Sequence, residues 1–130
     1  MTVSQSAQDE VTAATIAAIE HFNVVFNNHD VDGIMDAMTE DVVFEGTGPQ
    51  PDGARFEGQA AVREVWEGFF TSSPKAHFEC EDMFAAGDRC TVRWLYRWVD
   101  AEGKPGHIRG VDVFRVRDGK VAEKLAYVKG

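Results

Sequence analysis

The stretch RGVDVFRVRDGKVAEKLAYV, residues 109–128, contains two runs of alternating side chains joined by Asp118-Gly119. Alternation with a period of two is typical of β-strands, and an Asp-Gly pair between two such runs is a strong hairpin signal. The sequence therefore predicts two antiparallel strands, over about 107–116 and 120–128.

Two more strands are predicted upstream of this hairpin, over about 76–84 and 90–99, because both stretches also alternate. Turns at Gly87-Asp88 and at 100–103 join all four strands into a meander. The C-terminal half of the chain is therefore expected to form one antiparallel sheet.

Apolar residues recur at three- and four-residue steps in the N-terminal half, which is typical of amphipathic helices. This spacing predicts helices over 9–26 and 59–70, and a short helix between them that begins after Asp30 as its N-cap. A short strand at 42–44 and a loop rich in glycine and proline at 46–53 precede the last helix. The short helix is expected to carry Ile34, Met35 and Met38.

Helices followed by a strand meander predict an α+β fold, in which three N-terminal helices pack on one face of a curved antiparallel sheet. The chain has 130 residues, which is enough for one domain with its own core and too few for two. We assign this domain to 9–130 and expect the small, polar segment 1–8 to be disordered.

Composition argues against several kinds of partner. The net charge is −9, with 22 acidic and 13 basic residues, so neither nucleic acid nor an anionic membrane is an expected partner. The N-terminus shows no basic region followed by an apolar run, so no signal peptide is expected and a cytoplasmic location is predicted. Cys80 and Cys90 are then expected to be free thiols.

Strand parity assigns side chains to the two faces of the sheet. Pairing across the first turn of the meander places Phe78 near Tyr96, and it places Cys80 near Trp94. The face expected to be concave and covered by helices carries Val92, Trp94, Tyr96 and Trp98. The opposite face carries the charged residues His77, Glu79, Glu81, Arg93 and Arg97, which we expect to be solvated.

The outer face is also expected to carry an apolar patch. Such a patch is larger than a monomer usually leaves exposed, so a homodimer through the outer sheet face is predicted. The patch consists of Leu95, Val111, Val113, Leu125 and Tyr127.

Asp112 is the strongest candidate for a functional residue. It shares its parity with Gly110 and Phe114, so its carboxylate is expected to point into the apolar interior, where Gly110 leaves room for a ligand. A carboxylate in such a place is costly unless it is paired or protonated. Asp112 is therefore either a group that lines a pocket or a structural aspartate bonded to the backbone.

The position of Lys124 depends on the turn before it. A two-residue turn at Asp118-Gly119 puts Leu125, and not Lys124, on the face of Asp112. A three-residue turn with a glycine bulge puts Lys124 opposite Asp112 instead. Both arrangements are compatible with the sequence.

Three segments resemble the nuclear-transport-factor-2-like superfamily, and most closely its ketosteroid isomerase and SnoaL-like polyketide cyclase branches. They are HFNVVFNNHDVDGIMDAMTEDVVFEG at 21–46, GQAAVREVWEGFF at 58–70 and the closing segment quoted above. The resemblance extends over nearly the whole chain and implies a cone-shaped half-barrel with one internal pocket. It implies no single activity, because this fold carries isomerases, cyclases, dehydratases and binding domains.

The isomerase resemblance transfers only partly to this sequence. The family's oxyanion-hole aspartate falls on Asp112, but its general-base aspartate falls on Gly46 and its oxyanion tyrosine on Phe22. A further tyrosine of its hydrogen-bond network falls on Trp66. In SnoaL-like cyclases the final strand usually carries polar pocket residues, and these positions are Lys124 and Ala126 here.

Together these arguments predict a small enzyme that acts on an apolar, cyclic or carbonyl-bearing molecule, with a non-catalytic ligand-binding or assembly domain as the alternative. Asp112 is the expected acid or base, with Lys124 or Tyr96 as its polar helper. No metal and no cofactor are expected, because the four histidines are scattered. The residues expected to bind the ligand are Phe22, Phe26, Phe44, Trp66, Trp94, Trp98, Gly110 and Phe114.

Overall fold

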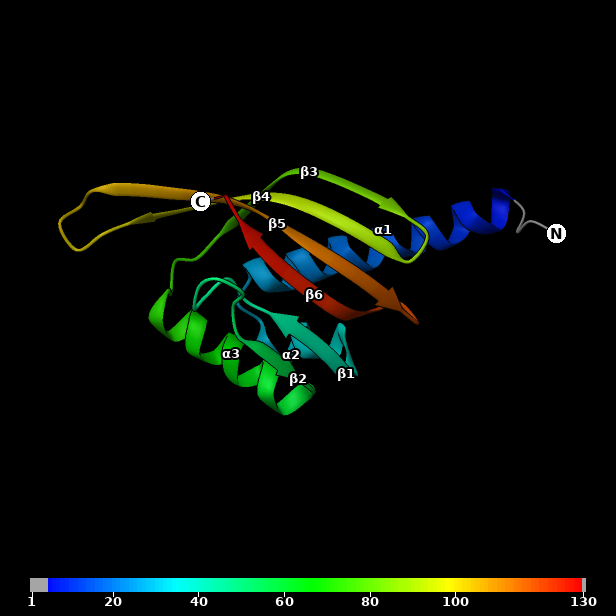
Figure 1. Cartoon of the computed structure of the whole chain (residues 1–130), viewed down its shortest axis with the longest axis horizontal. Helices are drawn as coiled ribbons and strands as arrows, with labels where there is room; N and C mark the ends of the chain where they lie inside the picture. The colour runs from blue at the N-terminus through cyan, green and yellow to red at the C-terminus, as the bar shows by residue number, and fades with distance from the viewer. Residues whose placement is uncertain (1–4, 130) are drawn as a thin grey trace.

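A computed structural model describes residues 5–129, in which an open sheet is covered on one face by helices (Figure 1). The elements, in chain order, are α1 (Gln5–Asn27), α2 (Val31–Asp36), β1 (Met38–Glu45), β2 (Arg55–Glu57), α3 (Gln59–Ser72), β3 (Phe78–Ala86), β4 (Arg89–Val99), β5 (Pro105–Arg117) and β6 (Lys120–Val128). The α+β prediction is confirmed, with three helices and the predicted four-strand meander.

The sheet is mixed, which corrects the expectation of a purely antiparallel sheet. Its strand order is β2-β1-β6-β5-β4-β3, and β1 runs parallel to β6 while every other neighbouring pair is antiparallel. No hairpin connects β1 to β6, so no turn fixes their relative direction. The sequence also gave no sign of β2, because a strand of three residues is too short to show alternation.

The helices cover the concave face of this sheet. Helix α1 packs on β3, β4 and β6, while α3 packs on β1 and β2. Asp30 caps α2 as predicted, because its carboxylate accepts a hydrogen bond of 3.0 Å from the Gly33 N–H. Met38 was wrongly placed in this helix: α2 ends at Asp36, and Met38 begins β1, where it is 1% exposed.

Helix α1 begins within the segment 1–8, which was expected to be disordered. Residues 1–4 of the expected disordered segment lie outside the described residues, while α1 already begins at Gln5. The first helix is therefore longer than the apolar spacing indicated, because that spacing only becomes regular after Asp9.

The first hairpin of the meander has the predicted register beyond a shift between Cys80 and Asp82, whereas next to the turn each pair is offset by one residue, so that Cys90 pairs with Ala85. Phe78 pairs with Tyr96, and Cys80 pairs with Trp94. The turn between β5 and β6 has two residues, and both Asp118 and Gly119 have positive φ angles, of 55° and 75°. Two-residue hairpins favour this conformation.

A register shift follows this turn. Arg115 pairs with Glu123 whereas Val116 pairs with Val121, so Ala122 is an extra residue in β6. A slip of one residue moves every later side chain to the other face. The turn therefore has two residues, as in the first predicted arrangement, but the bulge places Lys124 on the same face as Asp112, as in the second. The direct strand partner of Asp112 is Ala126, and Lys124 pairs with Phe114.

The C-terminal end of α1 holds the edge strand β3. The Asn27 side-chain amide donates to the Phe78 carbonyl and accepts from the Phe78 N–H, both at 3.0 Å. His29 Nε2 lies 2.7 Å from the Ala76 carbonyl, and its ring stacks on Phe70 at 4.2 Å. The Asn27 side chain therefore satisfies the two backbone groups of Phe78 that a neighbouring strand would otherwise bond, in addition to ending α1.

We predict that Asn27→Ala lowers the free energy of unfolding by about 1–3 kcal/mol, because it leaves two backbone groups of Phe78 without partners. The measurement is urea denaturation followed by circular dichroism. The control is Asn28→Ala at the exposed neighbouring position, which should change stability by less than about 0.5 kcal/mol. Equal effects of the two substitutions would show that the Asn27 bonds do not hold β3.

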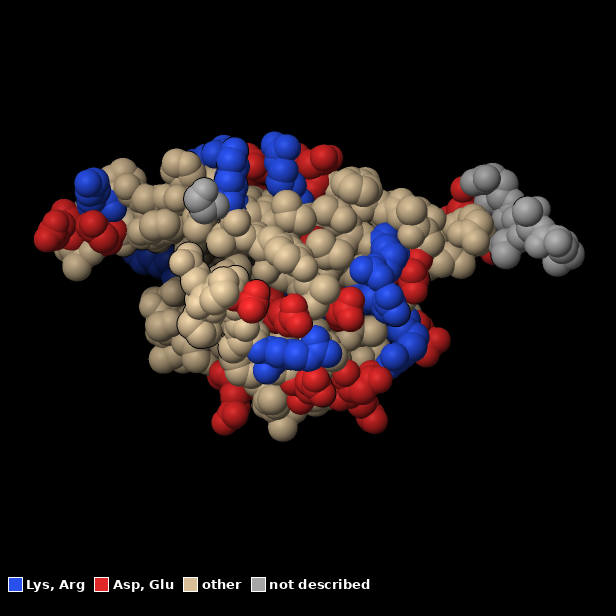
Figure 2. Space-filling view, in the orientation of Figure 1, with Lys and Arg blue, Asp and Glu red and all other residues tan. Residues whose placement is uncertain are grey.

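The outer face of β5 and β6 carries the predicted apolar side chains. Val111 pairs with Tyr127 and Val113 with Leu125, and Tyr127 is 56% exposed. Leu95 is only 2% exposed, so it contributes nothing to an accessible patch. Figure 2 shows this part of the sheet as mainly uncharged, with acidic and basic side chains around it.

We propose that two copies of the chain associate through this face, because burial of exposed apolar surface favours association. Tyr127→Asp should then convert a dimer into a monomer of 14.4 kDa in light scattering. Val24→Asp, at an exposed apolar position on α1, should leave the dimer intact. A parent protein that is monomeric at micromolar concentration would contradict the proposal.

Candidate active site

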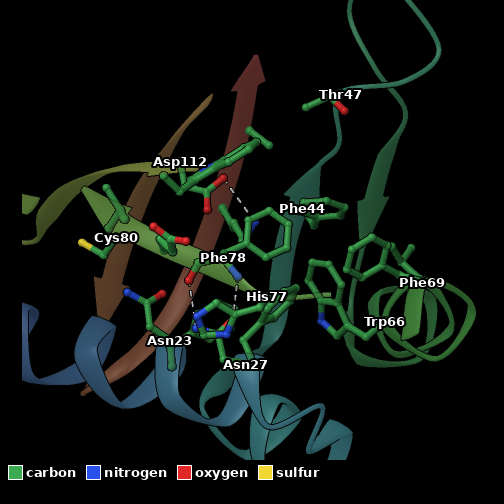
Figure 3. A pocket seen from close by; sticks show the side chains of 18 residues that line it. Asn23, Asn27, Phe44, Thr47, Trp66, Phe69, His77, Phe78, Cys80 and Asp112 are labelled. Carbon is green, nitrogen blue, oxygen red and sulfur yellow. Dashed lines mark hydrogen bonds and ion pairs between the residues drawn. The ribbon is translucent and has the colours of Figure 1, made fainter. Parts of the chain in front are cut away.

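A cavity of about 450 Å³ lies between α1, α3 and the concave face of the sheet (Figure 3). This volume lies within the usual range for small-molecule sites. Most of its wall is apolar, and seven of the eighteen lining residues are Phe or Trp. Of the residues predicted from the sequence, the wall contains Phe22, Phe26, Phe44, Trp66, Trp94, Asp112 and Lys124.

Two other predicted residues, Tyr96 and Trp98, lie outside this cavity. They line a separate, more open depression together with the segment 72–76. The Tyr96 ring packs against Phe78 at 4.8 Å, and Trp98 is 41% exposed. Both residues lie near the end of β4, which extends past the helices (Figure 1). They therefore lie beyond the part of the sheet that the helices enclose.

Gly110 and Phe114 also do not line the cavity. A Cβ atom on Gly110 would lie 2.3 Å from Cζ2 of Trp94, so the space beside Gly110 holds the Trp94 indole and not a ligand. Phe114 is fully buried and packs edge-on against Phe22 at 5.7 Å. Gly110 and Phe114 therefore pack against Trp94 and Phe22, which line the cavity, without lining it themselves.

Asp112 and Lys124 form an ion pair in the wall of the cavity. Lys124 Nζ lies 3.2 Å from Asp112 Oδ1, and the two side chains are only 9% and 12% exposed (dashed line in Figure 3). The contact has the distance of an ion pair but not the angles of a hydrogen bond, so Oδ1 has no hydrogen-bond partner. The direct strand partners of Asp112, Val92 and Ala126, supply only apolar side chains.

Aromatic rings surround the other sides of the lysine ammonium. Nζ lies 5.0 Å from the ring centroid of Phe44 and 5.6 Å from that of Trp66. The rings of Phe26 and Phe114 are at 5.8 and 6.0 Å. At these distances a cation is attracted to the ring faces, so Lys124 occupies an aromatic cage that is closed on one side by Asp112.

The less apolar part of the wall comes from residues that the sequence analysis did not select. Asn23 and Asn27 on α1, Thr47 after β1, and His77 and Cys80 on the β3 side all line the cavity (Figure 3). Glu79 lines it as well, so His77 and Glu79 are exposed as expected but are not separated from the cavity as an outer face would be. The spacing of Asn23 and Asn27, four residues apart on the apolar face of α1, could have indicated the first two. Thr47 lies in an irregular loop, where no periodic signal exists.

The described residues 5–129 contain no cluster of three or more His, Cys, Asp or Glu side chains that could hold a metal ion. Within the same residues, no helix has both the length and the apolar character needed to cross a membrane.

Helices packed on an open, curved sheet around one internal cavity define a protein of the NTF2-like class. The family model of the SnoaL-like domain matches residues 19–124, so the chain belongs to the SnoaL-like family. A comparison with curated proteins found no match.

Several solved structures are similar to this chain. An NTF2-like protein of unknown function from Mesorhizobium loti is 39% identical, with a TM-score of 0.78, and the match covers 92% of this chain and 93% of that one. TerC, which was co-crystallised with polyporic acid, is 24% identical over 89% and 92% of the two chains, with a TM-score of 0.75. A candidate ketosteroid isomerase from Kribbella flavida is 18% identical over 95% and 82%, with a TM-score of 0.78.

The two cysteines are free thiols, as predicted, and the structure places them in different surroundings. Cys80 is exposed and lines the cavity, whereas Cys90 is 2% exposed and pairs with Ala85. Burial raises the pKa of the Cys90 thiol to about 11, because a thiolate is poorly solvated there.

We predict that only Cys80 reacts with Ellman's reagent in the folded protein at about pH 8, because little Cys90 thiolate exists there. Cys90 should react after unfolding, and any ligand in the cavity should slow the reaction of Cys80. Cys80→Ser is the control and should remove the fast phase. Rapid reaction of both thiols in the native state would contradict the burial of Cys90.

Proposed function

We propose that this chain is a small enzyme that acts on an apolar, carbonyl-bearing small molecule, with Asp112 and Lys124 as its catalytic pair. The observation that carries this proposal is the ion pair at 3.2 Å between two largely buried side chains in the wall of an aromatic cavity. Clefts in which burial and a specific charged partner act on one group are common at active sites.

Stability alone does not account for this pair. Two charges lose their hydration when they are buried, and apolar residues of similar volume are often as stabilising or more so. Asp112 and Lys124 are also the only charged side chains among the buried residues that the structure describes. The pair is therefore better explained by what it does to a ligand in the cavity.

The pair suits proton transfer next to a carbonyl group. A carboxylate at Asp112 can take a proton from the carbon beside the carbonyl, while the Lys124 nitrogen polarises the carbonyl oxygen, where negative charge develops. Isomerisation, aldol cyclisation and dehydration all pass through this step. The aromatic walls at Phe44, Trp66 and Trp94 favour a flat, apolar substrate.

The second candidate is a domain that binds an apolar ligand without catalysis. It is favoured by Gly46 and Phe22, which stand where the resemblance to ketosteroid isomerases places a base and an oxyanion tyrosine. Phe22 is 1% exposed and offers no polar group to the cavity. Under this candidate the cavity would bind ligands but turn none over.

We predict that Asp112→Asn lowers turnover of an apolar enone or β,γ-unsaturated ketone by about 10²–10⁴-fold, because the amide cannot accept the proton. Single substitutions at either position should also cost about 3–5 kcal/mol of stability, because each leaves one buried charge unpaired. The measurements are ultraviolet absorbance for turnover and urea denaturation for stability.

The double variant Asp112→Leu with Lys124→Met is the matched control. It replaces both charges by apolar groups, so it should regain stability and still bind apolar ligands by tryptophan fluorescence, yet remain inactive. If it turns over every ligand as the parent does, the pair is structural and the enzymatic proposal fails. If the parent binds ligands but converts none, the binding domain is the better description.

A further inference from the structure

We infer that Lys124 forms a covalent imine with aldehyde and ketone ligands that enter the cavity. This inference rests on the proposed function, because it specifies how the same site activates a carbonyl group. It goes further in assigning a covalent intermediate to Lys124, where a hydrogen bond from the ammonium would be the simpler role.

The surroundings of Lys124 meet the needs of an amine nucleophile. The residue is 7% exposed and lines the cavity, so its nitrogen can meet a ligand but little water. Amines in apolar pockets are the usual sites of imine formation, since their ammonium form is poorly solvated there. Asp112 at 3.2 Å is the acceptor for the proton that must leave the nitrogen.

The proton balance closes within the pair. Transfer of a proton from the Lys124 ammonium to Asp112 gives an amine and a carboxylic acid and removes two buried charges. The amine attacks the carbonyl carbon, and its surplus proton and the acid proton pass through Asp112 to the former carbonyl oxygen. That oxygen leaves as water, and the nitrogen lone pair closes the carbon–nitrogen double bond.

The product of these steps is an iminium cation at the place of the original ammonium. The net reaction joins one ammonium and one carbonyl into one iminium and one water, so the charge of the site does not change. The cage formed by Phe26, Phe44, Trp66 and Phe114 then surrounds another cation, with the Asp112 carboxylate as its counter-ion. An iminium acidifies the adjacent carbon, so Asp112 can remove the next proton from there.

The test is reductive trapping with 2-naphthaldehyde, a flat apolar aldehyde, and sodium cyanoborohydride. Reduction fixes the imine as a stable amine, and the chain gains the mass of the aldehyde less one oxygen atom. Peptide mapping by mass spectrometry then locates the label among Lys75, Lys104, Lys120, Lys124 and Lys129. The label should fall mainly on Lys124, although Lys120 on the same strand is exposed.

Two substitutions sharpen the test. Lys124→Arg keeps a cation beside Asp112 but cannot form an imine, so the main label should be lost while the circular dichroism spectrum is unchanged. Lys120→Arg should leave the labelling of Lys124 unaltered. The inference is overturned if the label is spread over the exposed lysines, or if the same amount of label persists in Lys124→Arg. If that variant does not fold, the peptide map of the parent protein alone tests the inference.

Binding of 2-naphthol separates this inference from the proposed function, because 2-naphthol has a similar shape but no carbonyl group. If calorimetry shows that 2-naphthol binds while Lys124 is not labelled, the imine is wrong, whereas the proposed function keeps its ligand site and is decided by the turnover assay. If 2-naphthol does not bind and Lys124 is not labelled, the apolar-ligand function and the imine fail together.

Discussion

The site depends on one extra residue in β6. Without the bulge at Ala122, the parity set by the two-residue turn would put Leu125 beside Asp112 and Lys124 in solvent. Asp112 would then be a buried carboxylate with only apolar neighbours, which is a costly state. The bulge is therefore what brings a cation into the cavity wall, and both the ion pair and the cage around Lys124 follow from it.

The cavity also needs helix α1 to be held at a fixed height above the sheet. Side chains in the middle and at the C-terminal end of α1 bond to the backbone of the β3–β4 hairpin. Thr15 donates to the Gly87 carbonyl at 2.7 Å, and Thr12 accepts from the Gly87 N–H at 2.9 Å. Asn27, at the C-terminal end of α1, both donates to and accepts from the backbone of Phe78. With α1 fixed at two points, the space between it and the strands can remain unfilled by side chains.

The sequence was most informative where a repeating pattern exists. The inward face of Asp112 could be predicted because strand parity sets it. The pairing of Phe78 with Tyr96 was also predicted, but it depends on the register shift between Cys80 and Asp82, because the two-residue turn alone would pair Glu79 with Tyr96. Parity does not tell how far along a strand the cavity reaches, which is why Tyr96 and Trp98 were included. The bulge at Ala122, the strand β2 and the parallel pairing of β1 with β6 depend on distant contacts, and no local pattern records them.

The pair of opposite charges also restricts which ligands the cavity accepts. A ligand carboxylate that approached Lys124 would have to displace Asp112, which would then remain buried without a partner. A neutral carbonyl oxygen imposes no such cost, because it can meet the Lys124 nitrogen while Asp112 keeps its place. A cationic ligand would face the same difficulty at Asp112, with Lys124 left unpaired. Under the proposed function we therefore expect the site to favour uncharged molecules, in keeping with its apolar walls.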